Sequence, residues 1–159
     1  MYDVIPETSL NALDCGPTCL KMLLAYYGQE VDLDTLIKEC NVRLVGCSAG
    51  DIIRVGKLHG LDAMVAYYMD ADEVIRQDRP SIVHWKYLHW CICCGQDDNG
   101  NVVICNPDRG RYRMSKALFT SFYSGVAIFN GEPSDLPDPP EQATAEDYEA
   151  ALGRLGVSV

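Results

Sequence analysis

The chain of 159 residues lacks any apolar run that approaches the length of a membrane-spanning helix. Its N-terminus also lacks the basic start of a secretory signal peptide. Basic side chains are scarce, with 13 Lys and Arg against 23 Asp and Glu. The resulting formal net charge of −10 disfavours nonspecific binding to nucleic acid or to an anionic membrane. We therefore expect a cytoplasmic protein with no nucleic-acid partner and no membrane insertion.

Histidine is also scarce, with three residues, whereas cysteine is abundant, with eight. Because no secretion signal accompanies the cysteines, they are expected to be reduced thiols. Cys91, Cys93 and Cys94 fall in an apolar segment that we interpret as a strand, which places Cys91 and Cys93 on one face and Cys94 on the other. We expect no metal site and no cofactor.

The composition divides the chain into a core and a tail. Apolar residues make up 48% of the sequence, enough for one domain with a sizeable core, which we assign to residues 1–130. Residues 131–159 hold seven acidic residues against one basic residue and four of the eight prolines, which is typical of a linker without a core of its own. Thr144 can cap a short amphipathic helix through about Leu155, which would dock on this domain or on a protein partner.

The segment from Asp14 to Gly28 predicts a buried helix with a cysteine at its start. Gly-Pro directly after Cys15 is typical of a first helical turn, where the missing proline N–H costs nothing. Apolar residues repeat at i, i+3, i+4 and i+7 from Leu20 to Tyr27, and a glycine follows them. The helix dipole favours a thiolate at this end, so we expect Cys15 to have a lowered pKa and to act as a nucleophile. The alternative is a small cysteine packed in the core.

The second half of the chain supplies a histidine and an amide. The sequence predicts consecutive strands at 81–85, 88–95 and 101–105, with an Asn-Gly hairpin turn before the last of them. His89 opens the second of these strands, and Asn106 ends the third. In papain-like enzymes, Cys, His and Asn are the nucleophile, the general base and the residue that orients the imidazole ring. We therefore expect Cys15, His89 and Asn106 to form a catalytic set.

These motifs resemble those of the peptidase C39 family, the bacteriocin-processing, papain-like cysteine peptidases. The resemblance rests on Asp-Cys-Gly at 14–16 with Cys-Leu at 19–20, Pro-x-Ile-x-His-Trp at 80–85, a histidine that opens the next strand and Asn-Pro-x-x-Gly at 106–110. It covers roughly residues 8–130. It implies an α+β, papain-like fold with N-terminal helices packed on one side of an antiparallel sheet. It also implies cleavage of a peptide or leader sequence after a small-residue pair, typically Gly-Gly.

Two positions depart from the family pattern. Asn106 stands where the family usually has Asp, and Ser9 stands where the family has the Gln of its oxyanion hole, six residues before Cys15. Asn11 is the nearest side-chain amide. We expect the Cys15 backbone N–H and a side chain from Asn11 or Ser9 to face the oxyanion. Relatives are usually fused to an exporter, and we expect this chain to be a freestanding version that acts on a peptide or protein substrate.

Other functions fit the same residues. A C39-like domain could bind a peptide, or serve in assembly, without cutting anything, and Cys15 could instead transfer an acyl group through a thioester. Among the remaining histidines, His84 is expected to be a hydrogen-bonded structural residue, and His59 is expected to face solvent.

Overall fold

The structure, a computed structural model, describes residues 1–132, so the expected tail helix lies outside the described residues. Within this part, the helices are η1 (Ala12–Asp14), α1 (Cys15–Tyr26), α2 (Leu33–Glu39), α3 (Ala49–Leu58), α4 (Ala71–Ile75) and α5 (Lys116–Phe122). The strands are β1 (Met64–Tyr68), β2 (Ser81–Trp85), β3 (His89–Gln96), β4 (Val102–Asn106), β5 (Gly110–Met114) and β6 (Tyr123–Asn130). None of these helices has the length and apolar character needed to cross a membrane.

The six strands form one sheet in the order β1-β6-β2-β3-β4-β5, and all of its pairs are antiparallel. The last of the described strands, β6, lies between the first two, so that Ala127 pairs with both Tyr67 and Val83. The expected α+β class is confirmed.

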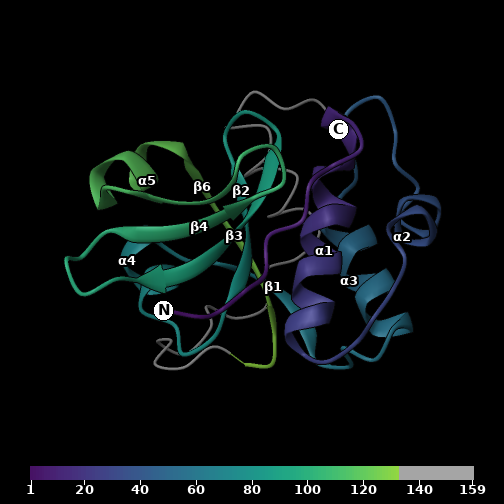
Figure 1. The fold of residues 1–159 in the computed structure, drawn as a ribbon, viewed down its shortest axis with the longest axis horizontal. Coiled ribbons are helices and arrows are strands. Elements are labelled where there is room, and N and C mark those ends of the chain that lie inside the picture. Colours follow the sequence, from purple (N-terminus) through teal and green to yellow (C-terminus); the bar gives the residue numbers. More distant parts are fainter. Residues whose placement is uncertain (133–159) are drawn as a thin grey trace.

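Helices cover both faces of this sheet (Figure 1). The side chains of α1 and α3 pack on one face, and those of α4 and α5 pack on the other. The expected packing of the N-terminal helices on one side of the sheet is confirmed, and the later helices α4 and α5 cover the other side. The reason lies in the strands: β4 is buried along its whole length and β3 is buried at all but its two end residues, so both faces need cover. As predicted, Cys91 and Cys93 lie on one face and Cys94 lies on the other.

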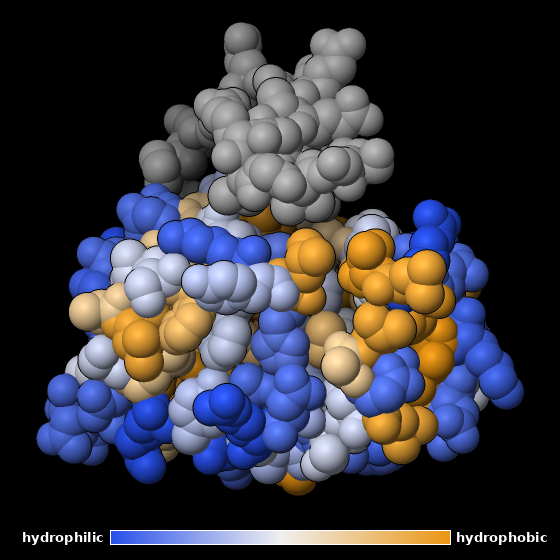
Figure 2. Space-filling model, turned by 90° about the horizontal axis from the view of Figure 1, so that it is seen from above, coloured by the Kyte–Doolittle hydropathy of each residue, from blue (hydrophilic) through white to orange (hydrophobic). Residues whose placement is uncertain are grey.

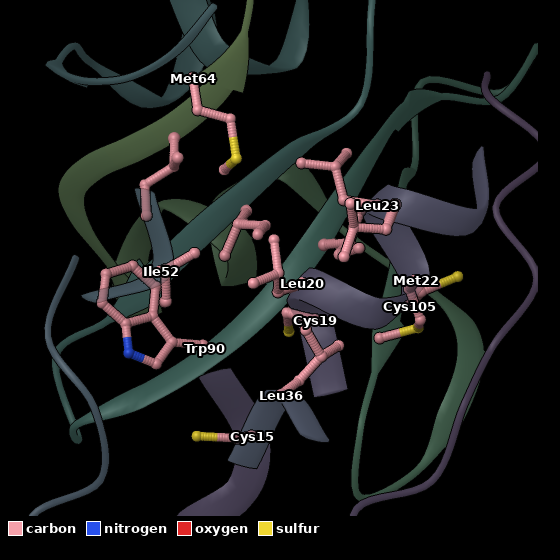
Figure 3. Packing of buried hydrophobic residues seen from close by; sticks show 14 of the residues in the cluster. Cys15, Cys19, Leu20, Met22, Leu23, Leu36, Ile52, Met64, Trp90 and Cys105 are labelled. Atoms are coloured by element: carbon pink, nitrogen blue, oxygen red, sulfur yellow. The ribbon is translucent and has the colours of Figure 1, made fainter. Parts of the chain in front are cut away.

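The α1 helix is central to the larger core cluster. Leu20 and Leu23 are fully buried, and Figure 3 shows them together with Ile52 and Trp90. Gly28 follows the helix with φ of 83°, a left-handed conformation that favours glycine and ends the helix as predicted.

Side-chain caps start four of the five described α-helices. The N-cap residues of α2, α3, α4 and α5 each accept a hydrogen bond from a backbone N–H three residues further on, and they are Asp32, Ser48, Asp70 and Ser115. Such caps satisfy N–H groups that have no partner inside the helix.

The N-terminal arm runs past the sheet before it reaches α1 (Figure 1). The Tyr2 N–H donates to the Cys94 carbonyl at 2.8 Å, and the Ser9 N–H donates to the Pro107 carbonyl at 3.0 Å. The Arg111 guanidinium donates to the carbonyl groups of Tyr2 and Val4. The arm is thereby tied to the strands that carry His89 and Asn106.

Candidate active site

Cys15 is the first residue of α1, and only 2% of its surface is exposed. The next residue has to be small, because a Cβ on Gly16 would overlap Cys47 Sγ and would lie 3.4 Å from the Trp90 ring. The Trp90 indole N–H donates to the Cys47 carbonyl at 3.2 Å. The start of α1, the loop before α3 and the start of β3 are therefore packed tightly together, with Cys15 at their junction.

The pKa of the Cys15 thiol is raised, chiefly by burial. Backbone N–H groups of Trp90 and Gly16 point to the sulfur and lower the pKa, while the Asp108 carboxylate raises it. The expectation of a lowered pKa is therefore wrong, because desolvation outweighs the N–H groups at the helix start. Cys15 is a neutral thiol in the resting protein and needs a base to become a nucleophile.

His89 and Asn106 are brought together by the pairing of β3 with β4. The His89 Nε2 and the Asn106 Oδ1 are 3.1 Å apart. Trp90, whose backbone N–H faces the Cys15 sulfur, directly follows His89, so the cysteine and the histidine lie at the same end of β3. Among the described residues, no hydrogen bond joins Cys15 to the His89 ring.

The hydrogen bonds of Asn106 decide which ring nitrogen is basic. The Asp108 backbone N–H donates to Asn106 Oδ1 at 2.8 Å, and Asn106 Nδ2 donates to the Tyr112 hydroxyl at 3.3 Å. The atom that faces His89 is therefore an acceptor, and Nε2 must carry a proton to donate to it. In the neutral ring, Nδ1 is then free to accept a proton.

Sequence reasoning missed Asp108 and Tyr112. The Asp108 Oδ2 lies 3.9 Å from His89 Nε2, and 48% of the Asp108 side chain is exposed. Tyr112, on β5, supports Asn106 from the side away from the histidine. Asp108 could have been suspected, because it follows Asn106 by two residues in the same turn, whereas Tyr112 depends on the register of β4 with β5.

The two candidate oxyanion residues have different partners. Asn11 is exposed and caps η1, where its Oδ1 accepts the Leu13 N–H at 2.9 Å. Within residues 1–132, its Nδ2 donates to no protein group. The Ser9 hydroxyl instead lies 3.2 Å from the hydroxyl of Thr18, the fourth residue of α1.

The other two histidines have structural partners. His84 Nδ1 lies 3.0 Å from the Ser124 hydroxyl, and its ring packs 4.7 Å from the Trp90 ring, as expected of a structural residue. Burial lowers the pKa of His84 to about 4. His59 does not simply face solvent, because its Nε2 lies 2.5 Å from a carboxylate oxygen of Glu39.

Metal binding receives no support from the described residues, which contain no group of three or more His, Cys, Asp or Glu side chains that could hold an ion. All eight cysteines are free and buried.

This arrangement defines a class of protein. A buried cysteine at the start of the core helix, with a histidine and an asparagine on adjacent antiparallel strands, is the architecture of the papain-like cysteine peptidases. Within this class the chain belongs to the Peptidase C39 family, whose sequence profile matches residues 6–135.

Two relatives show how far the sequence similarity extends. The chain is 27% identical over 125 residues to the colicin V secretion/processing ATP-binding protein CvaB of Escherichia coli, covering 79% of this chain and 17% of that protein. It is 29% identical over 160 residues to the lactococcin transport/processing ATP-binding protein LcnC-like of Lactococcus lactis subsp. lactis, covering 94% of this chain and 21% of that protein. The chain thus spans about a fifth of the length of these curated relatives.

Two solved structures share the fold. A double glycine motif protease from an AMS/PCAT transporter, in complex with the leader peptide, superposes with a TM-score of 0.74 at 22% identity, covering 80% of this chain and 91% of that one. The peptidase domain of Streptococcus ComA, a bifunctional ABC transporter, gives a TM-score of 0.67 at 24% identity, covering 81% and 97%.

Proposed function

We propose that the protein is a cysteine peptidase that removes the leader from a precursor peptide, after a small-residue pair such as Gly-Gly. The observation that carries the proposal is the 3.1 Å contact of His89 with Asn106, at the end of β3 where the Trp90 N–H meets the Cys15 sulfur. Family membership and the leader peptide bound to the related protease support the choice of substrate.

In the proposed mechanism, Asn106 holds the His89 ring with Nε2–H facing its Oδ1. The Cys15 proton passes to His89 Nδ1 as the sulfur attacks the scissile carbonyl carbon. The imidazolium then returns the proton to the leaving amine. Water hydrolyses the thioester on Cys15, with His89 again acting as the base.

The oxyanion formed on attack needs hydrogen-bond donors. We assign the Cys15 backbone N–H and Asn11 Nδ2 to this role, because the capping bond of Asn11 uses only its oxygen. Ser9 is the weaker candidate, since its hydroxyl is already paired with that of Thr18.

Cleavage can be tested by mass spectrometry on synthetic peptides that carry a Gly-Gly, Gly-Ala or Leu-Leu pair at the junction. We expect two products from the Gly-Gly and Gly-Ala peptides and none from the Leu-Leu peptide. Cys15→Ala and His89→Ala should each abolish cleavage, whereas Asp98→Asn, in an exposed hairpin turn, should have no effect. Intact Gly-Gly peptides after incubation with the unaltered protein would contradict the proposal.

A peptide-binding role is the second candidate, and the raised pKa of Cys15 is the observation that favours it. A binding module would hold the same peptides with equal affinity in the unaltered chain and in Cys15→Ala, with no product in either case. Acyl transfer would instead show itself when an added amine becomes joined to the N-terminal fragment.

A further inference from the structure

We propose that the Asp108 carboxylate is a positioning residue that stabilises the protonated His89 ring, supplying the negative charge that Asn106 lacks. The catalytic meaning of this assignment rests on the proposed peptidase function, whereas the interaction itself can be tested without any substrate. Asn106 can orient the ring, but a neutral amide gives an imidazolium less stabilisation than a carboxylate does.

The turn after β4 holds Asp108 beside the ring. Its backbone N–H donates to Asn106 Oδ1 at 2.8 Å, and its Oδ2 lies 3.9 Å from His89 Nε2. This separation is too long for a hydrogen bond and within the range of an ion pair. Within residues 1–132, it is the one carboxylate at ion-pair distance from His89.

The step concerned is a single proton transfer. The proton leaves Cys15 Sγ and binds His89 Nδ1, which converts a neutral thiol and a neutral ring into a thiolate and an imidazolium. The new positive charge spreads over the ring to Nε2, where the Asp108 carboxylate faces it. No other bond forms or breaks in this step.

The groups on the neighbouring elements do not replace this charge. His84, on β2, is uncharged above a pH of about 4 because burial lowers its pKa. Cys15, on α1, carries a negative charge only as the thiolate that forms in the same step as the imidazolium, and its raised pKa disfavours that charge in the resting protein. Asp108 also disfavours the thiolate, but its effect on Cys15 is smaller than those of burial and of the Trp90 and Gly16 N–H groups. Its net influence is therefore expected on the ring, which it approaches directly.

The test is the titration of the His89 ring protons by NMR in a Cys15→Ala chain, which removes coupling to the thiol. Asp108→Asn keeps the shape and the backbone hydrogen bond and removes the charge. We expect the titration midpoint of His89 to fall by about 0.2–0.7 pH unit, the size typical of partly exposed ion pairs. In 1 M NaCl the difference between the two chains should shrink.

Two controls separate this effect from a change in net charge or in folding. Asp98→Asn alters the net charge equally, at the far end of the β3–β4 hairpin, and should leave the His89 midpoint in place. The His59 ring, paired with Glu39, serves as an internal reference that neither variant should move. Equal His89 midpoints in the Asp108→Asn and Asp98→Asn chains would overturn the proposal.

A kinetic experiment tests whether the charge of Asp108 affects turnover. In a chain with Cys15 intact, His89 must be unprotonated to act as the base, so Asp108→Asn should move the acid limb of kcat/KM to lower pH, and adding Asn106→Asp should move it back. If no peptide is cleaved, the ring titration still decides the proposal while the peptidase function fails. If peptides are cleaved but the limb stays in place, Asp108 has no part in catalysis.

Discussion

At the scale of single residues, the site is governed by burial. Cys15 has 2% of its surface exposed, and desolvation raises its pKa even though N–H groups point to its sulfur. The proposed mechanism therefore requires proton transfer to His89, and it makes the orientation of the ring by Asn106 important. Burial also lowers the pKa of His84, five residues before His89, to about 4.

The low pKa of His84 predicts acid-sensitive stability. Between pH 6.5 and about 4 the unfolded chain binds a proton at this ring that the folded chain does not. The His84 contribution is therefore fully present above pH 6.5 and falls by about 3 kcal/mol as the pH drops to about 4. Denaturant unfolding at a series of pH values measures this loss. In His84→Asn, the free energy of unfolding should depend less on pH between about 4 and 6.5. An unchanged dependence on pH would assign the loss of stability to other groups.

Gly16 predicts a steric penalty next to Cys15. Gly16→Ala should lower the free energy of unfolding by about 1–3 kcal/mol, because the added methyl overlaps Cys47 Sγ in a packed interior. Gly50→Ala is the matched control, since this helical glycine has only the Ser48 hydroxyl at 3.7 Å and alanine favours the helix. Both are measured by urea unfolding. Equal free energies of unfolding for the two variants would show that the loop carrying Cys47 moves to accommodate the added methyl group.

At the scale of elements, the site is assembled from separate pieces of chain that meet at one end of the sheet. The helix α1 presents Cys15, and the hairpin of β3 and β4 brings His89 to Asn106. Leu88, just before the histidine, has φ of 59°, which is unusual for a leucine and turns the chain sharply into β3. Asn11, four residues before Cys15, caps η1, which leads directly into α1.

The role of Asn11 can be separated from its capping function. Asn11→Asp keeps the oxygen that accepts the Leu13 N–H but removes the Nδ2 donor. If the amide stabilises the oxyanion, the acylation rate should fall about 100- to 1000-fold, with little change in the thermal midpoint. Ser9→Ala should reduce the rate less. Single-turnover kinetics measure the effect, and a fully active Asn11→Asp chain would remove the residue from the oxyanion hole.

At the scale of the whole molecule, the sheet carries a buried cluster on each face, and both clusters lie between Val4 and Phe129. Space-filling Figure 2 shows apolar surface broken up by hydrophilic side chains on the face seen from above. Leu44, on the loop before α3, and Tyr87, before β3, are among the exposed apolar residues of the molecule. Both buried clusters are thus built from residues that precede the tail.

Because both buried clusters precede the tail, we predict that the tail is dispensable for folding. A chain that ends at Gly131 keeps β6 and the hydrogen bond from the Gly131 N–H to the Ala63 carbonyl. It should unfold in one cooperative transition with a midpoint close to that of the full chain. Thermal unfolding followed by circular dichroism tests this. A molten or aggregated product would show that residues 132–159 complete the core.

Local signals in the sequence determined much of this protein. The Gly-Pro pair and the apolar spacing placed α1, Gly28 ended it, and alternation assigned Cys91, Cys93 and Cys94 to their faces. Such features depend on propensities and periodicities that act over a few residues. The order of Cys, His and Asn along the chain was enough to select the papain-like class.

Only the tertiary structure determined the electrostatic surroundings of the site residues and which side chains lie next to them. The raised pKa of Cys15 comes from desolvation by residues distant in sequence, which a helix-start argument does not include. The insertion of β6 between β1 and β2 and the contact of Tyr112 with Asn106 follow from long-range pairing. The approach of Asp108 to His89 depends on how the turn after β4 packs against β3. The residues proposed for catalysis could be selected from the sequence, whereas the effect of their surroundings on proton binding could not, because charge energies depend on burial and distance in the folded chain.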